Sequence, residues 1–235
     1  MSYSVIAVLF KCNNTHCKNI ISAAIDVLYV VLKPMIPWPS KNEILCNMPK
    51  CFNNFKSTRI VIDCIDIPIM KPKTLSASII TYSHYKSTYT AKFMTGVTPA
   101  GILSFVSQGY GGRVSDKFIF ENSLLINLLE EDDAIMADKG FLIDSVCAEK
   151  HVKLFRPTFL KGKRQFSSKK ALLNNSIASA RVHIERVNQR IKIFSILNKF
   201  PSSLTSKLDE IFFIICAIVN LSVPILAIDK FLKCN

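Results

Sequence analysis

Three acidic residues have the type and placement needed to hold divalent metal ions for phosphodiester chemistry. Asp63 ends the apolar run 60–62, Asp138 follows the apolar run 134–137, and Glu185 lies among arginines in a late segment. Hard divalent cations prefer carboxylate oxygens as ligands. In two-metal phosphoryl transfer, one cation activates the attacking water or 3′-hydroxyl and the other stabilises the leaving oxygen. The acids would serve this chemistry if two strand ends and one helix bring them together.

Each of these acids also has an ordinary structural interpretation. The first could simply end a strand, with Asp66 competing for its role, and the second could pair with Lys139. The third could bond Arg181 or Gln189, each of which is one helical turn away. Taken singly, each acid fits a structural role. The three together, in the order of their elements, favour a metal site.

A fourth acid, Asp116, follows the glycine-containing loop 109–115. Ser115 can cap a helix that begins at this residue. An acid in the first turn of a helix interacts favourably with the helix dipole, which is one interpretation. The other is that Asp116 lies near the metal site and supports its ligands. The sequence leaves both open.

Basic residues flank the third acid and precede it. They are Arg181, Arg186, Arg190 and Lys192 around Glu185, and Lys161, Lys163 and Arg164 in the preceding loop. Such side chains bind phosphates without reading the base sequence. We therefore predict a DNA-binding track along these residues, with a solvated basic face as the alternative.

The elements that must position these residues can be outlined from the pattern of the chain. We expect strands over 60–69, 89–97, 102–108, 134–137 and 152–155, and helices over 20–32, 116–129 and 168–197. The Pro/Gly connection 98–101 between two β-rich runs is typical of a hairpin. Ile177, Ile184 and Ile191 repeat every seven residues and predict one buried face on the long helix. This order predicts an α/β protein, an RNase H-like mixed sheet with flanking helices.

Composition narrows the class of protein. The chain has 235 residues, 49% of them apolar, and a formal net charge of +13. It can therefore bury a core, and its charge suggests a polyanionic partner such as nucleic acid or an anionic membrane. The eight cysteines show neither compact disulfide spacing nor a CxxC pair. That pattern indicates a reducing compartment and argues against zinc.

Two apolar stretches, 20–38 and 211–228, resemble membrane spans. The second has 18 uncharged residues, just enough to cross a bilayer. It contains Asn220, Ser222 and Pro224 and is flanked by acids. We therefore expect a buried C-terminal helix there and no membrane partner.

Several short blocks of the chain form a recognisable set, at 38–40, 48–49, 61–66, 82–86, 92–93, 98–101, 104–107, 110–117, 136–141, 177–178 and 181–186. Together they span roughly 37–225 and resemble eukaryotic DDE transposases related to the Harbinger and P-instability-factor group, most closely the branch associated with THAP-type zinc domains. They occur in the order of that family, and the set is specific.

The resemblance implies a metal-dependent DNA endonuclease in the nucleus. It assigns the D–D–E triad to Asp63, Asp138 and Glu185 and the cofactor to Mg²⁺ or Mn²⁺. Metal-activated water would attack a DNA phosphodiester, and a 3′-hydroxyl could follow in strand transfer. The partner would be DNA, with a separate DNA-binding protein and a homo-oligomer as further possibilities.

The chain departs from this family in two places. Ile65 and Asp66 stand where the first block usually has Thr and Glu, so a hydroxyl is missing beside the site. Residues 1–36 show no helix-turn-helix or THAP zinc pattern. We expect an N-terminal segment over 1–57, partly helical and left from a truncated DNA-binding region, a nuclease domain over 58–200, and a C-terminal apolar helix within 201–235. The alternative function is a catalytically inactive DNA- or protein-binding module on the same fold.

Overall fold

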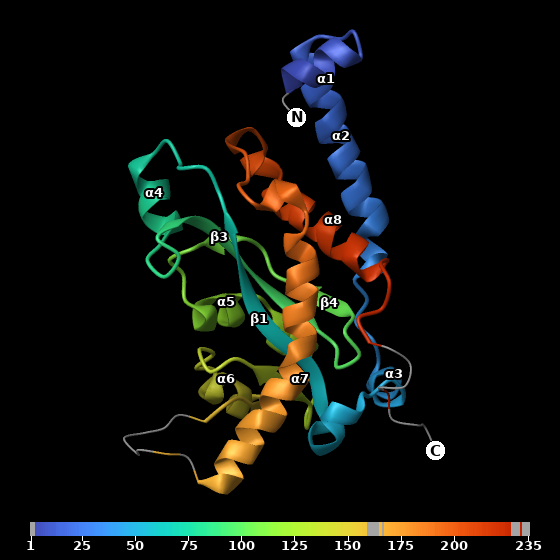
Figure 1. The fold of residues 1–235 in the computed structure, drawn as a ribbon, viewed down its shortest axis with the longest axis vertical. Coiled ribbons are helices and arrows are strands. Elements are labelled where there is room, and N and C mark those ends of the chain that lie inside the picture. The colour runs from blue at the N-terminus through green and yellow to red at the C-terminus, as the bar shows by residue number, and fades with distance from the viewer. Residues whose placement is uncertain (1–2, 159–164, 166, 227–230, 232–235) are drawn as a thin grey trace.

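The computed structural model describes residues 3–158, 165, 167–226 and 231, and Figure 1 shows their arrangement. The strands are β1 (Thr58–Pro68), β2 (Tyr82–Ser83), β3 (Thr88–Val97), β4 (Leu103–Val106), β5 (Tyr110–Gly111), β6 (Ala134–Ala137) and β7 (Lys153–Phe155). The α-helices are α1 (Tyr3–Leu9), α2 (Asn14–Leu32), α3 (Lys41–Cys46), α4 (Leu75–Thr81), α5 (Asp116–Asn122), α6 (Asp144–Glu149), α7 (Ser168–Lys192) and α8 (Leu208–Asn220). Short 3-10 helices are η1 (Lys33–Met35), η2 (Lys50–Phe55), η3 (Leu125–Leu128), η4 (Ser195–Leu197) and η5 (Ser202–Lys207).

The described strands form one mixed sheet. Its main order is β2-β3-β1-β6-β7, and β4 and β5 also pair with β3. β1 lies at the centre, antiparallel to β3 and parallel to β6, and β6 is parallel to β7. The chain is therefore an α/β protein with a mixed sheet and flanking helices.

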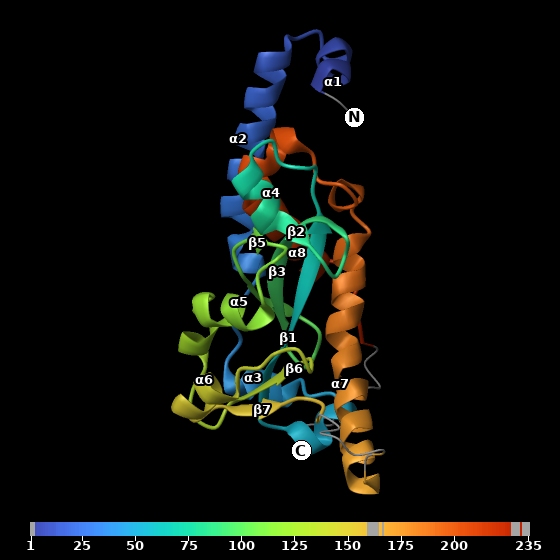
Figure 2. The same cartoon turned by 90° about the vertical axis from the view of Figure 1, so that its left-hand side faces the viewer.

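Helices cover both faces of this sheet (Figures 1 and 2). Successive side chains of a strand point to opposite faces, so β1 contributes to two separate cores. On one face, Val61 packs in a hydrophobic cluster with Ile184 of α7 and Phe212 of α8. On the other face, Ile62 packs in a second cluster with Phe120 of α5. The long helix and the short helices thus lie on opposite sides of the central strand.

The N-terminal helices extend beyond the sheet (Figure 1). Asn13 accepts a hydrogen bond from the backbone N–H of His16 at 2.7 Å and so caps the start of α2. Near its other end, α2 packs on α8, where the ring of Tyr29 meets that of Phe213 edge-on at 5.1 Å. An ion pair between Asp26 and Lys207 joins the same region. The predicted helix over 20–32 is therefore longer and begins at Asn14.

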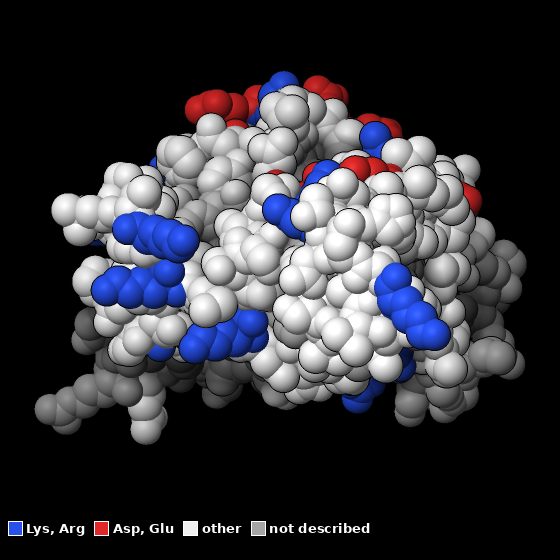
Figure 3. Space-filling view, turned by 90° about the horizontal axis from the view of Figure 1, so that it is seen from above, with Lys and Arg blue, Asp and Glu red and all other residues white. Residues whose placement is uncertain are grey.

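One segment of the described chain, Asn14–Met35, is long and apolar enough to cross a membrane, and 6% of its apolar window is buried. Core helices and signal sequences meet the same criteria, so length and hydropathy alone do not assign it to a bilayer. Figure 3 shows this end of the molecule as mostly uncharged surface with separated basic side chains. The second stretch, 211–228, differs because α8 buries Phe212 and Cys216 and ends at Asn220. Residues 227–228 lie outside the described part.

Other boundaries also differ from the sequence-based predictions. The helix expected over 116–129 ends at Asn122, because Leu124 takes a left-handed conformation with φ 61° and a 3-10 turn follows. The helix expected over 168–197 ends at Lys192. α4 and β2 occupy 75–83, where no element was predicted. The strands expected over 102–108 and 152–155 are shorter, at Leu103–Val106 and Lys153–Phe155.

Candidate functional site

Asp63 and Asp138 lie side by side at the end of one strand pair. β1 and β6 run parallel, and their last paired residues are Ile62 and Ala137. Each acid is the next residue along its strand. The structure therefore brings together the first two acids predicted from sequence, and both line one cleft of about 660 Å³.

Asp63 is held by three neighbours. Its Oδ1 accepts a hydrogen bond from the backbone N–H of Cys64 at 2.9 Å, and its Oδ2 accepts one from Nδ2 of Asn188 at 3.1 Å. The amide oxygen of Asn188 in turn accepts from the hydroxyl of Thr95 at 3.0 Å. Thr95 is the residue paired with Asp63 across the sheet. This chain of bonds fixes the carboxylate between β1, β3 and α7.

Burial raises the pKa of Asp63 to about 6, because the charged carboxylate loses hydration there. The negative charge of Asp138 raises this pKa further. The guanidinium of Arg181 opposes both effects, as do the hydrogen bonds from Cys64 and Asn188. Two neighbouring carboxylates, one of them largely buried, repel each other, so nearby positive charge stabilises their ionised forms.

Arg181 supplies positive charge beside these two carboxylates. Its Nη1 donates to Oδ1 of Asp138 at 2.9 Å, and the side chain is 11% exposed, against 50% for Asp138. Its Nε is buried and has no hydrogen-bond partner within the described residues. Arg181, predicted as a DNA contact, is thus a largely buried ion-pair partner of the second acid.

Glu185 lies on the same helix face as these partners. It is one turn after Arg181 and just under one turn before Asn188, and residues at these spacings share a face of a helix. Its side chain is exposed. Within the described part of the chain, no three His, Cys, Asp or Glu side chains are close enough to hold a metal ion. The structure therefore joins Asp63 and Asp138 and does not group Glu185 with them.

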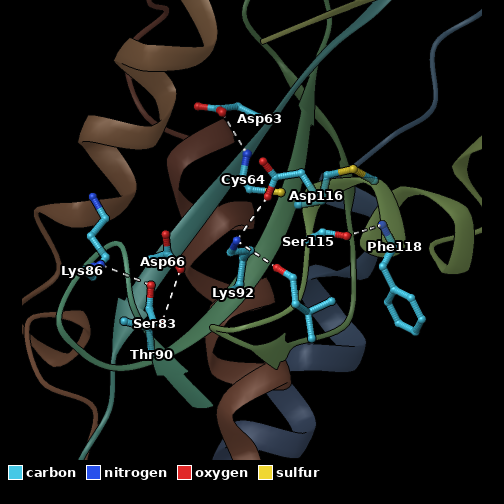
Figure 4. A network of polar contacts seen from close by, with 12 residues as sticks. Asp63, Cys64, Asp66, Ser83, Lys86, Thr90, Lys92, Ser115, Asp116 and Phe118 are labelled. Carbon is cyan, nitrogen blue, oxygen red and sulfur yellow. Dashed lines mark hydrogen bonds and ion pairs between the residues drawn. The ribbon is translucent and has the colours of Figure 1, made fainter. Parts of the chain in front are cut away.

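Asp116 also lines this cleft and occupies the first turn of α5. Ser115 caps that helix by accepting from the backbone N–H of Phe118 at 3.2 Å. Lys92 donates to Oδ1 of Asp116 at 3.2 Å and to the backbone oxygen of Val114 at 3.0 Å (Figure 4). Both sequence interpretations of Asp116, a first-turn acid and a neighbour of the site, thus describe its position.

The side chains of Cys64 and Asp66 point to the other face of β1 from Asp63, because side chains alternate along a strand (Figure 4). Burial, and then the carboxylate of Asp116, raise the pKa of the Cys64 thiol. Asp66 accepts from the hydroxyl of Thr90 at 3.3 Å. The cleft therefore has an oxygen-rich lining, and its thiol is kept protonated.

The remaining basic residues of the predicted DNA-binding track differ in their contacts and exposure. Arg190 donates to the backbone oxygens of Val223 and Pro224 after α8. Arg186 and Lys192 are exposed on α7. Lys161, Lys163 and Arg164 lie outside the described residues.

Two functional candidates were missed by the sequence interpretation. Asn188 is buried and bonds Asp63, and its spacing from Glu185 on the helix was an available signal. Lys92 lies in the middle of β3, where a basic residue on a largely buried strand was a second signal. The roles of Asn188 and Lys92 can be recognised only once β1 and α5, which carry their partners Asp63 and Asp116, are placed beside them.

The two acids joined in this cleft are of the type that a hard divalent cation takes. Asp63 and Asp138 offer carboxylate oxygens, the ligands that Mg²⁺ and Mn²⁺ prefer, while the predicted third ligand, Glu185, is not grouped with them among the described residues. Because burial deprives the charge of Asp63 of hydration, positive charge beside it would be stabilising, as the lowering effect of Arg181 on its pKa indicates. Arg181 already supplies one such charge from the α7 side.

Comparisons with known proteins give one match, to a protein family. A family model described as DDE superfamily endonuclease matches residues 62–220, which include all three acids. No curated protein and no solved structure matches the chain.

Proposed function

Because the chain belongs to the DDE superfamily endonuclease family, we propose that it is a metal-dependent DNA endonuclease of the transposase type. The observation that carries this proposal is the parallel β1–β6 pair, which sets Asp63 and Asp138 next to each other. The sheet order, with three antiparallel strands followed by two parallel ones, supports an RNase H-like core.

In the proposed site, Asp63, Asp138 and Glu185 would hold Mg²⁺ or Mn²⁺. When bound, such cations acidify water and stabilise the charge that develops on phosphate oxygens. Asn188 and the backbone of Cys64 orient Asp63. Arg181 orients Asp138 from α7. Glu185 would complete the ligand set from the helix face between these two positioning residues.

The finer assignments are part of the same proposal. The motifs at 82–86, 110–117 and 136–141 support the Harbinger and P-instability-factor group and its THAP-associated branch. The family supports DNA as substrate. The nucleus as the compartment is part of our proposal. We retain the division into 1–57, 58–200 and 201–235, and a separate DNA-binding protein or a second copy of the chain as further partners.

A second candidate is a catalytically inactive DNA- or protein-binding module. Two observations favour it: Arg181 already pairs with Asp138, and Glu185 lies outside the aspartate pair. This candidate predicts salt-sensitive DNA binding that survives the loss of all three acids.

Cleavage of supercoiled DNA separates the two candidates. The purified chain with Mg²⁺ or Mn²⁺ should nick the plasmid, and Asp138→Asn should abolish nicking. Asp132→Asn is the matched control, because Asp132 is 86% exposed, forms an ion pair with Lys153 and does not line the cleft. Nicking that persists in Asp138→Asn would overturn the proposed mechanism, and no nicking by the wild type would favour the binding module.

A further inference from the structure

The turn between β2 and β3 carries an exposed aromatic ring beside the candidate site. Tyr85 is 87% exposed, the highest fraction among the large apolar side chains that the structure describes. Tyr85 and its neighbours His84 and Lys86 line the same cleft as Asp63 and Asp138. A single exposed aromatic ring is ordinary. An exposed ring in the same cleft as Asp63 and Asp138 suggests a role in ligand binding.

Contacts with residues of β2 and β3 fix the conformation of this turn. The ring of Tyr82 packs edge-on against His84 at 5.3 Å and against Tyr89 at 5.4 Å. The backbone N–H of Lys86 donates to the hydroxyl of Ser83 at 3.3 Å. Tyr85 is therefore presented on a preformed turn, and a ligand that contacts its ring meets little ordering cost from the backbone.

The ring of Tyr85 is paired with a cation. The ammonium of Lys86 lies 4.7 Å from the ring centroid. A ring that offers a stacking face next to a positive charge is the combination by which proteins bind single-stranded nucleic acid, with the base on the ring and the phosphate at the cation. In the view of Figure 4, Lys86 lies next to Asp66 of β1, and Asp63 lies farther along the same strand.

The lining of the cleft combines two kinds of side chain. It includes the carboxylates of Asp63 and Asp138 together with Lys86, Arg113 and the ring of Tyr85. A DNA strand in this cleft can place one phosphate near the acids while Lys86 and Arg113 neutralise a neighbouring phosphate. A base inside a duplex has both faces covered by its neighbours, so Tyr85 can stack only on an unpaired one.

We propose that Tyr85 and Lys86 bind an unpaired nucleotide next to the phosphate that enters the site, with Tyr85 stacked on the base and Lys86 on the phosphate. The identification of the strand as DNA rests on the proposed function. The stacking itself rests on the exposed ring, its cation and the shared cleft.

Binding of a short single-stranded oligonucleotide with a central 2-aminopurine tests this proposal, in EDTA so that no cleavage occurs. Wild-type chain and Tyr85→Phe should quench 2-aminopurine fluorescence on binding, because both keep a ring. Tyr85→Ala should lose the quenching and weaken binding about tenfold. Lys86→Ala should weaken binding and flatten its dependence on salt.

Phe10→Ala is the control, since Phe10 is 76% exposed at the α1–α2 end of the molecule. It should bind and quench like the wild type. Quenching and affinity that stay unchanged in Tyr85→Ala would overturn the proposal, as would a wild-type chain that binds only duplex DNA. Loss of nicking with retained quenching would count against the nuclease function alone, so the two proposals can fail separately.

Discussion

Arg181 on α7 and Asp138 at the end of β6 are joined by an ion pair of 2.9 Å. This contact ties the helix that carries the third acid to the strand that carries the second. It also sets a positive charge beside Asp63, where that charge lowers a pKa that burial raises. Arg181 thus interacts with both aspartates of the candidate site, with Asp138 through an ion pair and with Asp63 through its charge.

Arg181→Ala should raise the pKa of Asp63 above its value of about 6, since the largest opposing influence on this carboxyl is removed. The carboxyl resonance of Asp63, followed by NMR through a pH titration, measures the change directly. Arg186→Ala, an exposed change on the same helix, should leave the titration where it is. An unshifted titration in Arg181→Ala would contradict the role given to this guanidinium.

The pKa of Asp63 also predicts how stability depends on pH. A carboxyl whose folded-state pKa is raised favours folding while it is protonated, and this contribution is lost as pH rises from its unfolded value of 3.8 through about 6. Asp63→Asn removes the loss, so at pH 7.5 it should raise the free energy of unfolding by up to about 3 kcal/mol. At pH 4 the difference should be small. Urea unfolding at both pH values measures it, and a gain that is equal at both would rule out titration as the cause.

Divalent cations should stabilise the folded chain. A ligand that binds only the native state adds about 2.7 kcal/mol at a concentration one hundred times its dissociation constant. We expect Mg²⁺ and Mn²⁺ to raise the melting temperature of the wild type at pH 7.5. Asp138→Asn should abolish the rise and Glu185→Gln should reduce it, while Asp132→Asn keeps it. A Glu185→Gln chain with the full wild-type rise would remove Glu185 from the ligand set.

Asn188→Ala should destabilise the fold. It leaves Oδ2 of Asp63 and the hydroxyl of Thr95 without the amide that joins them. An unsatisfied buried polar group costs about 1–3 kcal/mol. Gln189→Ala, an exposed neighbour on α7, should cost far less, and urea unfolding of the two variants gives the comparison. Equal losses would mean that the Asp63–Asn188–Thr95 chain contributes little.

The sequence predicted the parts of the site that local pattern determines. Asp63 and Asp138 each end a short apolar run, and such runs become paired, buried strands. The sevenfold spacing of Ile177, Ile184 and Ile191 predicted the buried face of α7, and all three are buried. These features depend on the chain's own periodicity, so one sequence suffices to find them.

The remainder depends on tertiary packing. Nothing in the local sequence says that Arg181 turns inward to Asp138, because a long side chain on a helix reaches whatever charge faces it. The break before η3 depends on Leu124 adopting a left-handed backbone, which its residue type does not signal. α4 and β2 are short and are held by β3 and β5, so they too lack a strong signal of their own.

The parallel pairing of β1 and β6 has a consequence for how this chain can change. In both strands the acid follows directly after the Ile62–Ala137 pair, so the register of the strands sets the two acids next to each other. Substitutions inside the strands leave this register unchanged, provided the new side chains fit the core. Insertion or deletion of a single residue in β6 shifts the alignment of the residues that follow it and turns their side chains to the opposite face. Asp138 would then point away from Asp63, so the length of β6 should be constrained more tightly than its composition.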